Sequence, residues 1–286
     1  MVKTLKGIIT AIIAVALLLI AMLPVALLAL LKLILPGAQA KRFVARLLSS
    51  FAEHWLMCGR WCYCLLHQPD WLRGLPESLS REKSYLVLAN HKSWSDIPVL
   101  MFLLIGHVPF FRFLMKRVLV WLPVVGWGAW ALDFPLLHRF SKAHLLAHPE
   151  DRQKDQDSLA ELCASLQQQP ATIIIFAEGT RFTEAKHAAQ NSPYQHLLQP
   201  RSGGVSILLQ GLGEQINQCL DFTLIYRGDA GFWRFLTGEL ELRVELTTRD
   251  IPDTFTKNSA ANELGHSARV KDWLSDMWAE KDQLLS

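Results

Sequence analysis

The sequence has few charged residues, few cysteines and none of several well-known catalytic motifs. Charged side chains make up 19% of its 286 residues, the formal net charge is +3, and no basic stripe with interleaved aromatic residues is present. These features argue against a nucleic-acid partner. The five cysteines are odd in number and scattered, which predicts reduced thiols rather than a disulfide framework. No G-x-S-x-G elbow and no metal-ligand spacing occurs, so we expect no metal, no bound cofactor and no serine-hydrolase nucleophile.

Apolar residues, by contrast, make up 51% of the chain. Residues 7–31 contain no charge, and as a helix this run would be about 37 Å long, more than the ~30 Å hydrocarbon core of a bilayer. Lys3, Lys6 and the Ala-Gln-Ala run at 38–40 resemble a signal peptide, but the apolar run is much longer than a signal-peptide core. We therefore expect a membrane-inserted helical segment over residues 1–36, with membrane lipids as partners.

The orientation of this segment stays open at the sequence level. Basic residues flank both of its ends, which is unusual for a single span. Pro24 lies late in the run and could kink it, so that the segment enters and leaves the same leaflet. A single tilted span fits the sequence equally well.

Residues 37–76 are expected to form an amphipathic helix followed by a linker. Apolar residues between 41 and 67 recur in alternating steps of four and three, the spacing of one helix face. The helix could lie on the membrane surface or pack on a catalytic core. Proline and glycine between 69 and 76 predict a loop. The apolar stripe consists of Val44, Leu48, Phe51, Trp55, Cys58, Cys62 and Leu65.

Residues 77–286 alternate between strand and helix patterns, which predicts an α/β catalytic domain: a mostly parallel central sheet flanked by helices. The last predicted strand alternates apolar and polar residues, so one of its faces should meet water. The predicted strands are 84–89, 109–113, 131–136, 172–176, 221–226 and 239–247. The predicted helices are 97–105, 115–121, 155–168, 203–217 and 261–284.

The run Asn90-His-Lys-Ser-Trp-Ser-Asp96 lies between a predicted strand and a predicted helix. A histidine that acts as a general base needs one free ring nitrogen and a partner that fixes the proton on the other. Asp96 can be that partner for His91 if the backbone turns back. A His-x4-Asp spacing alone is weak, because a solvated loop histidine also explains it.

A second polar turn follows the apolar strand 172–176 and reads Glu178-Gly-Thr-Arg181. Gly179 lets the backbone approach a ligand closely, and the Arg181 guanidinium can hold a phosphate. A turn with an internal Glu178–Arg181 pair is the simpler alternative. The carboxyl ends of parallel strands share one rim of a sheet, so we expect this turn and the His91 turn to lie together.

The two motifs, in this order and about 80 residues apart, resemble the glycerolipid acyltransferases, which include the 1-acyl-glycerol-3-phosphate (lysophosphatidic acid) acyltransferases. The resemblance covers roughly residues 84–226. Between the motifs, Lys116 fits the basic position of a third family block, and Arg139 is the counterpart of an arginine with altered spacing. Ala177 stands where the family usually has proline. These variants are similar to the bacterial YihG-type branch.

The resemblance implies a role for each motif residue. His91 is expected to take the proton from a glycerol hydroxyl while Asp96 holds its tautomer. Lys116 and Arg181 are expected to hold the substrate phosphate, and Arg139 is a further substrate-binding residue. Glu178, with Gly179 and Thr180 beside it, is expected to orient Arg181 or the glycerol.

The resemblance also implies transfer of a fatty acyl chain from acyl-carrier protein or coenzyme A to 1-acyl-glycerol-3-phosphate, which gives phosphatidic acid. Both donors are cytosolic, so the expected location is the inner (cytoplasmic) membrane with the site facing the cytosol. The alternatives are another lysophospholipid or glycerol 3-phosphate as acceptor, a thioester hydrolase, and a non-catalytic membrane scaffold.

Overall fold

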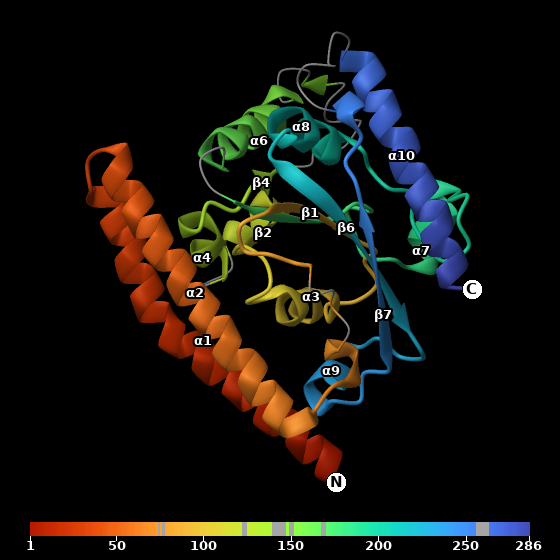
Figure 1. The fold of residues 1–286 in the computed structure, drawn as a ribbon. Coiled ribbons are helices and arrows are strands. Elements are labelled where there is room, and N and C mark those ends of the chain that lie inside the picture. The colour runs from red at the N-terminus through yellow and green to blue at the C-terminus, as the bar shows by residue number, and fades with distance from the viewer. Residues whose placement is uncertain are drawn as a thin grey trace.

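The computed structural model describes residues 1–73, 75, 78–121, 125–138, 147–148, 152–166, 170–255 and 263–286 (Figure 1). Its centre is a five-stranded sheet in the order β2-β5-β1-β6-β7, in which β7 alone is antiparallel to its neighbour. The mostly parallel α/β fold predicted from the sequence is therefore confirmed. The strands are β1 (Ser84–Ala89), β2 (Phe111–Phe113), β5 (Thr172–Phe176), β6 (Ile216–Tyr226) and β7 (Leu242–Arg249).

Helices cover both faces of this sheet (Figure 1). On one face, Leu86 and Leu88 of β1 belong to a core with α6 (Arg152–Leu166), α8 (Gly203–Leu212) and α10 (Glu263–Leu284). On the other face, Tyr85, Val87 and Ala89 pack with α3 (Asp96–Leu104) and α9 (Phe232–Thr237). All six residues of β1 are buried, as expected for a central parallel strand.

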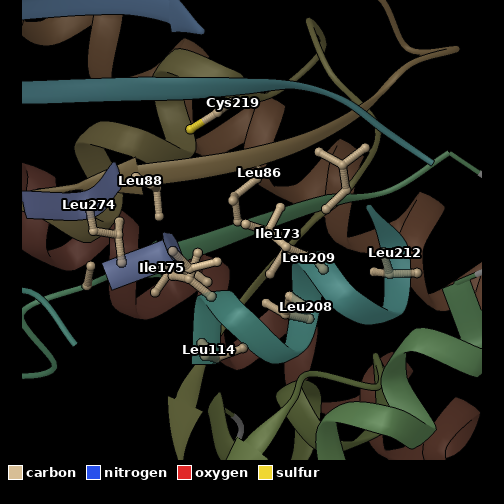
Figure 2. Close-up of a cluster of buried hydrophobic side chains, with 14 of the residues drawn as sticks. Leu86, Leu88, Leu114, Ile173, Ile175, Leu208, Leu209, Leu212, Cys219 and Leu274 are labelled. Atoms are coloured by element: carbon tan, nitrogen blue, oxygen red, sulfur yellow. The ribbon is translucent and has the colours of Figure 1, made fainter. Parts of the chain in front are cut away.

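The first of these cores is close-packed aliphatic material (Figure 2). Leu86 and Ile173, from neighbouring strands, face Leu208 and Leu209 of α8 in this view, and Leu212 lies further along the same helix. Burying a leucine or isoleucine side chain contributes roughly 1.5–3 kcal/mol. This packing holds the two strands that carry the sequence motifs in fixed register.

The N-terminal quarter forms a hairpin of two long helices, α1 (Val2–Ile34) and α2 (Ala38–His67), which run side by side in Figure 1. Within the described residues, α1 is the helix long and apolar enough to cross a membrane. Only 6% of its most apolar 18-residue stretch is buried. The predicted apolar helical segment is confirmed, and α1 continues through Pro24. Trp55 Nε1 donates to the Leu17 carbonyl at 2.8 Å and ties the two helices together.

The predicted amphipathic stripe of α2 is only partly correct. Val44 and Leu48 are buried, but Cys58 and Leu65 are exposed, and Leu56 and Tyr63 are buried instead. The predicted stripe repeats every 3.5 residues, whereas an α-helix turns every 3.6, so a long straight stripe drifts off the contact face. The contact face of α2 packs on α1 and α3.

Short elements account for the other differences. The predicted strand 131–136 is wrong, because α4 (Val125–Ala131) occupies its start and β4 is only Leu136–Leu137. The predicted helix 115–121 is instead β3 (Met115–Lys116) and the 3-10 turn η2 (Arg117–Trp121). The predicted helix 203–217 ends at Leu212, and β6 begins at Ile216 because it pairs with β1. The unpredicted α7 (Glu184–Gln190), α9 and the 3-10 turns η1 (Asp70–Leu72) and η4 (Asp253–Phe255) are too short for a clear period.

A buried lysine anchors α10 to the sheet. Lys281 is 1% exposed, and its Nζ donates to Asp221 Oδ1 at 2.5 Å and to the Phe222 carbonyl at 2.7 Å. Arg249 of β7 also lies 3.1 Å from Asp221, so the carboxylate is shared between two cations. Burial lowers the pKa of Lys281, and Asp221 opposes that change.

We predict that Lys281→Ala lowers the free energy of unfolding by roughly 3–5 kcal/mol, because Asp221 would lose its main buried partner. Lys271→Ala, on an exposed position of the same helix, is the control and should stay within about 0.5 kcal/mol of wild type. Denaturant titration of both variants in detergent measures the difference. Equal stability of the two variants would contradict a structural role for the Lys281 ion pair.

Candidate active site

The two sequence motifs lie side by side at the carboxyl rim of the sheet. Ala89, the last residue of β1, is paired with Phe176, the last residue of β5. The chain leaves both strands at the same level, and Phe182 N–H donates to the His91 carbonyl at 2.7 Å between the two turns. The expected juxtaposition of the motifs is what the backbone shows.

His91 and Asp96 form a hydrogen-bonded pair. His91 Nδ1 lies 2.8 Å from Asp96 Oδ2, and the backbone N–H groups of Lys92 and Ser93 donate to the same oxygen at 2.7 and 2.8 Å. The Asp96 side chain is completely buried in the first turn of α3, where the helix dipole favours negative charge. Among the described residues, no hydrogen bond occupies Nε2 of His91. The histidine thus has the fixed nitrogen and the free nitrogen that a general base requires.

Aromatic packing fixes the plane of the His91 ring. The ring stacks on Phe176 with centroids 4.0 Å apart and planes 17° apart, and Phe176 stacks in turn on Phe113 of β2. The His91 side chain is 14% exposed. It lines a small pocket together with residues from four other segments: Glu178, Phe182, His196, Leu197, Ile225, Tyr226 and Leu285.

Glu178 joins three segments through backbone hydrogen bonds. Its Oε1 accepts the His91 N–H at 3.1 Å, and its Oε2 accepts the Leu198 N–H at 3.3 Å. Burial raises the pKa of Glu178 to about 8, against the opposing effect of these two backbone bonds. In the described part of the chain no hydrogen bond or ion pair joins Glu178 to Arg181. Glu178 instead clamps the backbone of the His91 turn, and its role in orienting Arg181 or the glycerol stays a prediction.

The Arg181 guanidinium lies over the Trp94 ring, with its central carbon 4.4 Å from the ring centroid. This contact joins the two turns on their outer side, where Trp94 is 52% exposed. Gly179 has φ 72°, which a residue with a Cβ rarely adopts. Lys186 braces the turn through hydrogen bonds to Thr180 Oγ1 (2.8 Å) and to the Arg181 carbonyl (2.9 Å).

Two further candidate residues are placed differently from the rest. Lys116 is exposed on β3. Among the described residues, no hydrogen bond or ion pair joins it to His91 or Arg181. Arg139 lies outside the described residues.

The structure adds residues that the motifs did not identify. Asn90 binds the backbone of Leu224 on β6 through both atoms of its amide, at 2.8 and 3.0 Å. The Tyr226 hydroxyl donates to Asp96 Oδ1. Ser93 Oγ donates to the carbonyl of Ala230 and holds the loop after β6 against the turn. The predicted end of a strand at Tyr226 was the available signal, because that strand end falls on the same rim as the motifs.

The sequence matches the Acyltransferase family model over residues 74–227, slightly more than half of its length. The chain belongs to the Acyltransferase family. The resemblance to glycerolipid acyltransferases is confirmed at this level, and the placement in the YihG-type branch stays a prediction.

Individual relatives of this acyltransferase-family chain are distant. An uncharacterized acyltransferase of Schizosaccharomyces pombe is 24% identical over 74% of this chain and 61% of its own length. The 1-acyl-sn-glycerol-3-phosphate acyltransferase gamma of Mus musculus is 28% identical over 59% of this chain and 46% of its own length. The chain thus spans about half the length of these relatives. The crystal structure of the 1-acyl-sn-glycerophosphate (LPA) acyltransferase PlsC from Thermotoga maritima aligns over 97% of this chain and 95% of that chain, with 15% identity and a TM-score of 0.45.

We predict that Glu178→Gln changes how stability depends on pH. Between the ordinary pKa of 4.5 and the folded-state value of about 8, the folded protein binds a proton that the unfolded chain does not. The contribution of Glu178 to the free energy of unfolding of the wild type therefore falls as pH rises from 4.5 to about 8. The glutamine variant loses one acceptor oxygen at every pH but cannot ionise, so its deficit in melting temperature should be largest at pH 5 and shrink towards pH 8.

Glu184→Gln, an exposed residue of α7, is the matched control. Its difference from wild type should be small and constant over the same pH range. A Glu178→Gln deficit that does not change with pH would contradict the raised pKa of Glu178.

Proposed function

We propose that this chain is a membrane-associated O-acyltransferase that acylates the free hydroxyl of 1-acyl-glycerol-3-phosphate to give phosphatidic acid. The donor is the thioester of acyl-carrier protein or of coenzyme A. The observation that carries this proposal is the His91 ring, which is held at Nδ1 by buried Asp96 and lines a pocket. The name of the mouse relative supports the choice of acceptor.

The chemistry requires no covalent enzyme intermediate. His91 Nε2 takes the proton of the acceptor hydroxyl as the oxygen attacks the thioester carbonyl carbon. The new C–O ester bond forms, the C–S bond breaks, and the thiolate leaves and receives the proton from the imidazolium. Asp96 stabilises that imidazolium and keeps the ring in the tautomer whose Nε2 can accept a proton.

Arg181 binds the phosphate of the acceptor in this proposal. Its guanidinium lies on the outer side of the two turns, stacked on Trp94, and a planar guanidinium suits a phosphate. Lys116 and Arg139 are additional phosphate ligands by family resemblance. Gly179 and Thr180 form the turn that presents Arg181, and Lys186 braces it.

Residues 77–286 form the catalytic domain in this proposal, residues 1–36 insert into the inner membrane, and residues 37–76 connect the two. The exposed apolar surface of α1 supports insertion. The basic residues at both ends of the apolar run, and the cytosolic location of both donors, favour a site that faces the cytosol. The acceptor would then reach the His91 pocket from the same leaflet.

The test is acyl transfer by purified full-length protein in lipid vesicles, with both donors and a panel of acceptors. Phosphatidic acid should form from 1-acyl-glycerol-3-phosphate, and His91→Ala should lower the rate by about 10²–10⁴-fold. His107→Ala, exposed just beyond the opposite end of α3 from Asp96, should keep normal activity. Near-normal turnover by folded His91→Ala would disprove the mechanism. Donor consumption without an acceptor would indicate a hydrolase, and product from another acceptor alone would correct the substrate.

A second prediction concerns the Arg181–Trp94 contact. Arg181→Ala should raise KM for the acceptor by roughly tenfold or more, because a charge-assisted contact to phosphate is lost. Trp94→Ala should raise KM for the acceptor about two- to fivefold, the value of an exposed cation–π contact. Trp94→Phe keeps an aromatic ring under Arg181, so its KM should stay closer to wild type.

Trp127→Ala is the control for this series, because Trp127 is 49% exposed and lies on α4, outside both turns. Steady-state kinetics with a short-chain, water-soluble acceptor measures KM and kcat separately. If Trp94→Ala and Trp127→Ala behaved alike, Trp94 would have no role in aiming Arg181.

A further inference from the structure

Strand β6 is longer than its neighbour β1, and its extra residues run alongside the His91 turn. Ala89, the end of β1, pairs with Phe222, so four more residues of β6 continue past that point to Tyr226. The Asn90 amide continues the pairing, since it binds both backbone groups of Leu224. Side chains alternate along a strand, and Phe222, Leu224 and Tyr226 accordingly all belong to the core on the α3 face.

This register places the Tyr226 hydroxyl on the catalytic carboxylate. The hydroxyl donates to Asp96 Oδ1, whereas His91 Nδ1 and two backbone N–H groups bind Oδ2. No other donor among the described residues reaches Oδ1. Asp96 is completely buried and Tyr226 is 9% exposed, so bulk water does not replace this bond. Burial raises the pKa of Tyr226 well above its usual range, so the hydroxyl keeps its proton and acts as a donor.

We propose that Tyr226 is a positioning residue that sets the basicity of His91 through Asp96. Its hydroxyl holds Oδ1 so that Oδ2 faces the imidazole, and it draws negative charge towards Oδ1. A carboxylate that shares its charge in this way stabilises the imidazolium less strongly. The inference rests on the proposed role of His91 as the base.

The consequence has a definite sign. Without the hydroxyl, more negative charge stays on Oδ2, which stabilises the imidazolium form of the His91 ring. The acidic limb of the pH–rate profile should then move to higher pH. A tyrosine that only filled space would lower activity without moving that limb.

The other titratable groups around His91 and Asp96 come from separate elements. The Tyr226 hydroxyl bonds to Asp96, so Tyr226→Phe removes no hydrogen bond of these other groups. Glu178 after β5 is the other buried carboxyl, and Lys281 on α10 acts on it electrostatically. His196 lines the same pocket from the segment before α8. Arg227 and Asp229, on the loop after β6, are exposed. Lys92, within the turn, is also exposed and binds Asp96 through its backbone.

The experiment measures kcat and kcat/KM of full-length Tyr226→Phe from pH 5 to 9 in lipid vesicles. We expect kcat at neutral pH to fall about three- to tenfold, the equivalent of one lost hydrogen bond of ordinary strength. The apparent pKa of the acidic limb should rise by about half a unit to one unit. KM for the acceptor should stay within about twofold of wild type, since Tyr226 does not bind the phosphate.

Tyr85→Phe is the matched control. The Tyr85 side chain is completely buried at the start of β1, and its hydroxyl accepts the Ser80 N–H at 2.9 Å. Removing this hydroxyl should cost comparable stability and leave the apparent pKa unchanged. An equal shift of the apparent pKa in both variants would mean that the loss of any buried hydroxyl moves the acidic limb of the pH–rate profile. That result would overturn the proposal.

A second measurement keeps the proposal testable if Tyr226→Phe does not fold. The chain has four tyrosines, and biosynthetic replacement of all four by 3-fluorotyrosine makes each phenol a stronger donor without changing its shape. The apparent pKa should then fall, opposite to the phenylalanine variant. If Tyr226→Phe folds, the same labelling of that variant should give no fall.

The outcomes separate this inference from the proposed function. If wild-type protein transfers no acyl group, or if His91→Ala stays active, the proposed function fails. If wild type is active and His91→Ala is not, but neither Tyr226→Phe nor fluorotyrosine moves the acidic limb, the role of Tyr226 alone is disproved.

Discussion

The parallel pairing of β1 with both β5 and β6 is the interaction on which the rest of the molecule depends. It pairs both edges of β1, and it aligns Ala89 with Phe176 on one side and with Phe222 on the other. Because all three strands point the same way, three chain segments emerge at one rim. The His91 turn is the middle one, and it receives Glu178 from one neighbour and Tyr226 from the other.

The hydrogen bonds of the buried carboxyl groups at this rim come mostly from the backbone. Asp96 accepts two backbone N–H groups besides the His91 ring, and Glu178 accepts two more from His91 and Leu198. A buried carboxyl needs such donors, since leaving it unpaired costs several kcal/mol or more. The two acids therefore lock the path of the chain around the candidate base, and aromatic stacking on Phe176 locks its ring.

The sequence predicted the parts of this site that depend on local pattern. The strands 84–89 and 172–176 are continuous apolar runs, and a polar turn after each made His91, Asp96, Glu178 and Arg181 identifiable. The predicted strand end placed Tyr226 at the same rim, but the strand order β5-β1-β6 leaves no local trace, so neither the bond from Tyr226 to Asp96 nor the Asn90–Leu224 clamp could be predicted. The same limit applies to the backbone partners of Glu178. It also explains the errors at 115–121 and 131–136, where short segments take their structure from neighbours rather than from their own periodicity.

A site whose acids are held by main-chain donors can persist through extensive evolutionary change. Every residue except proline supplies an N–H, so the exposed side chain at Lys92 can vary while its N–H group goes on serving Asp96, and buried Leu198 serves Glu178 through its N–H rather than its side chain. Such a design is compatible with a family in which this chain and its relatives share only 24% and 28% of their aligned residues.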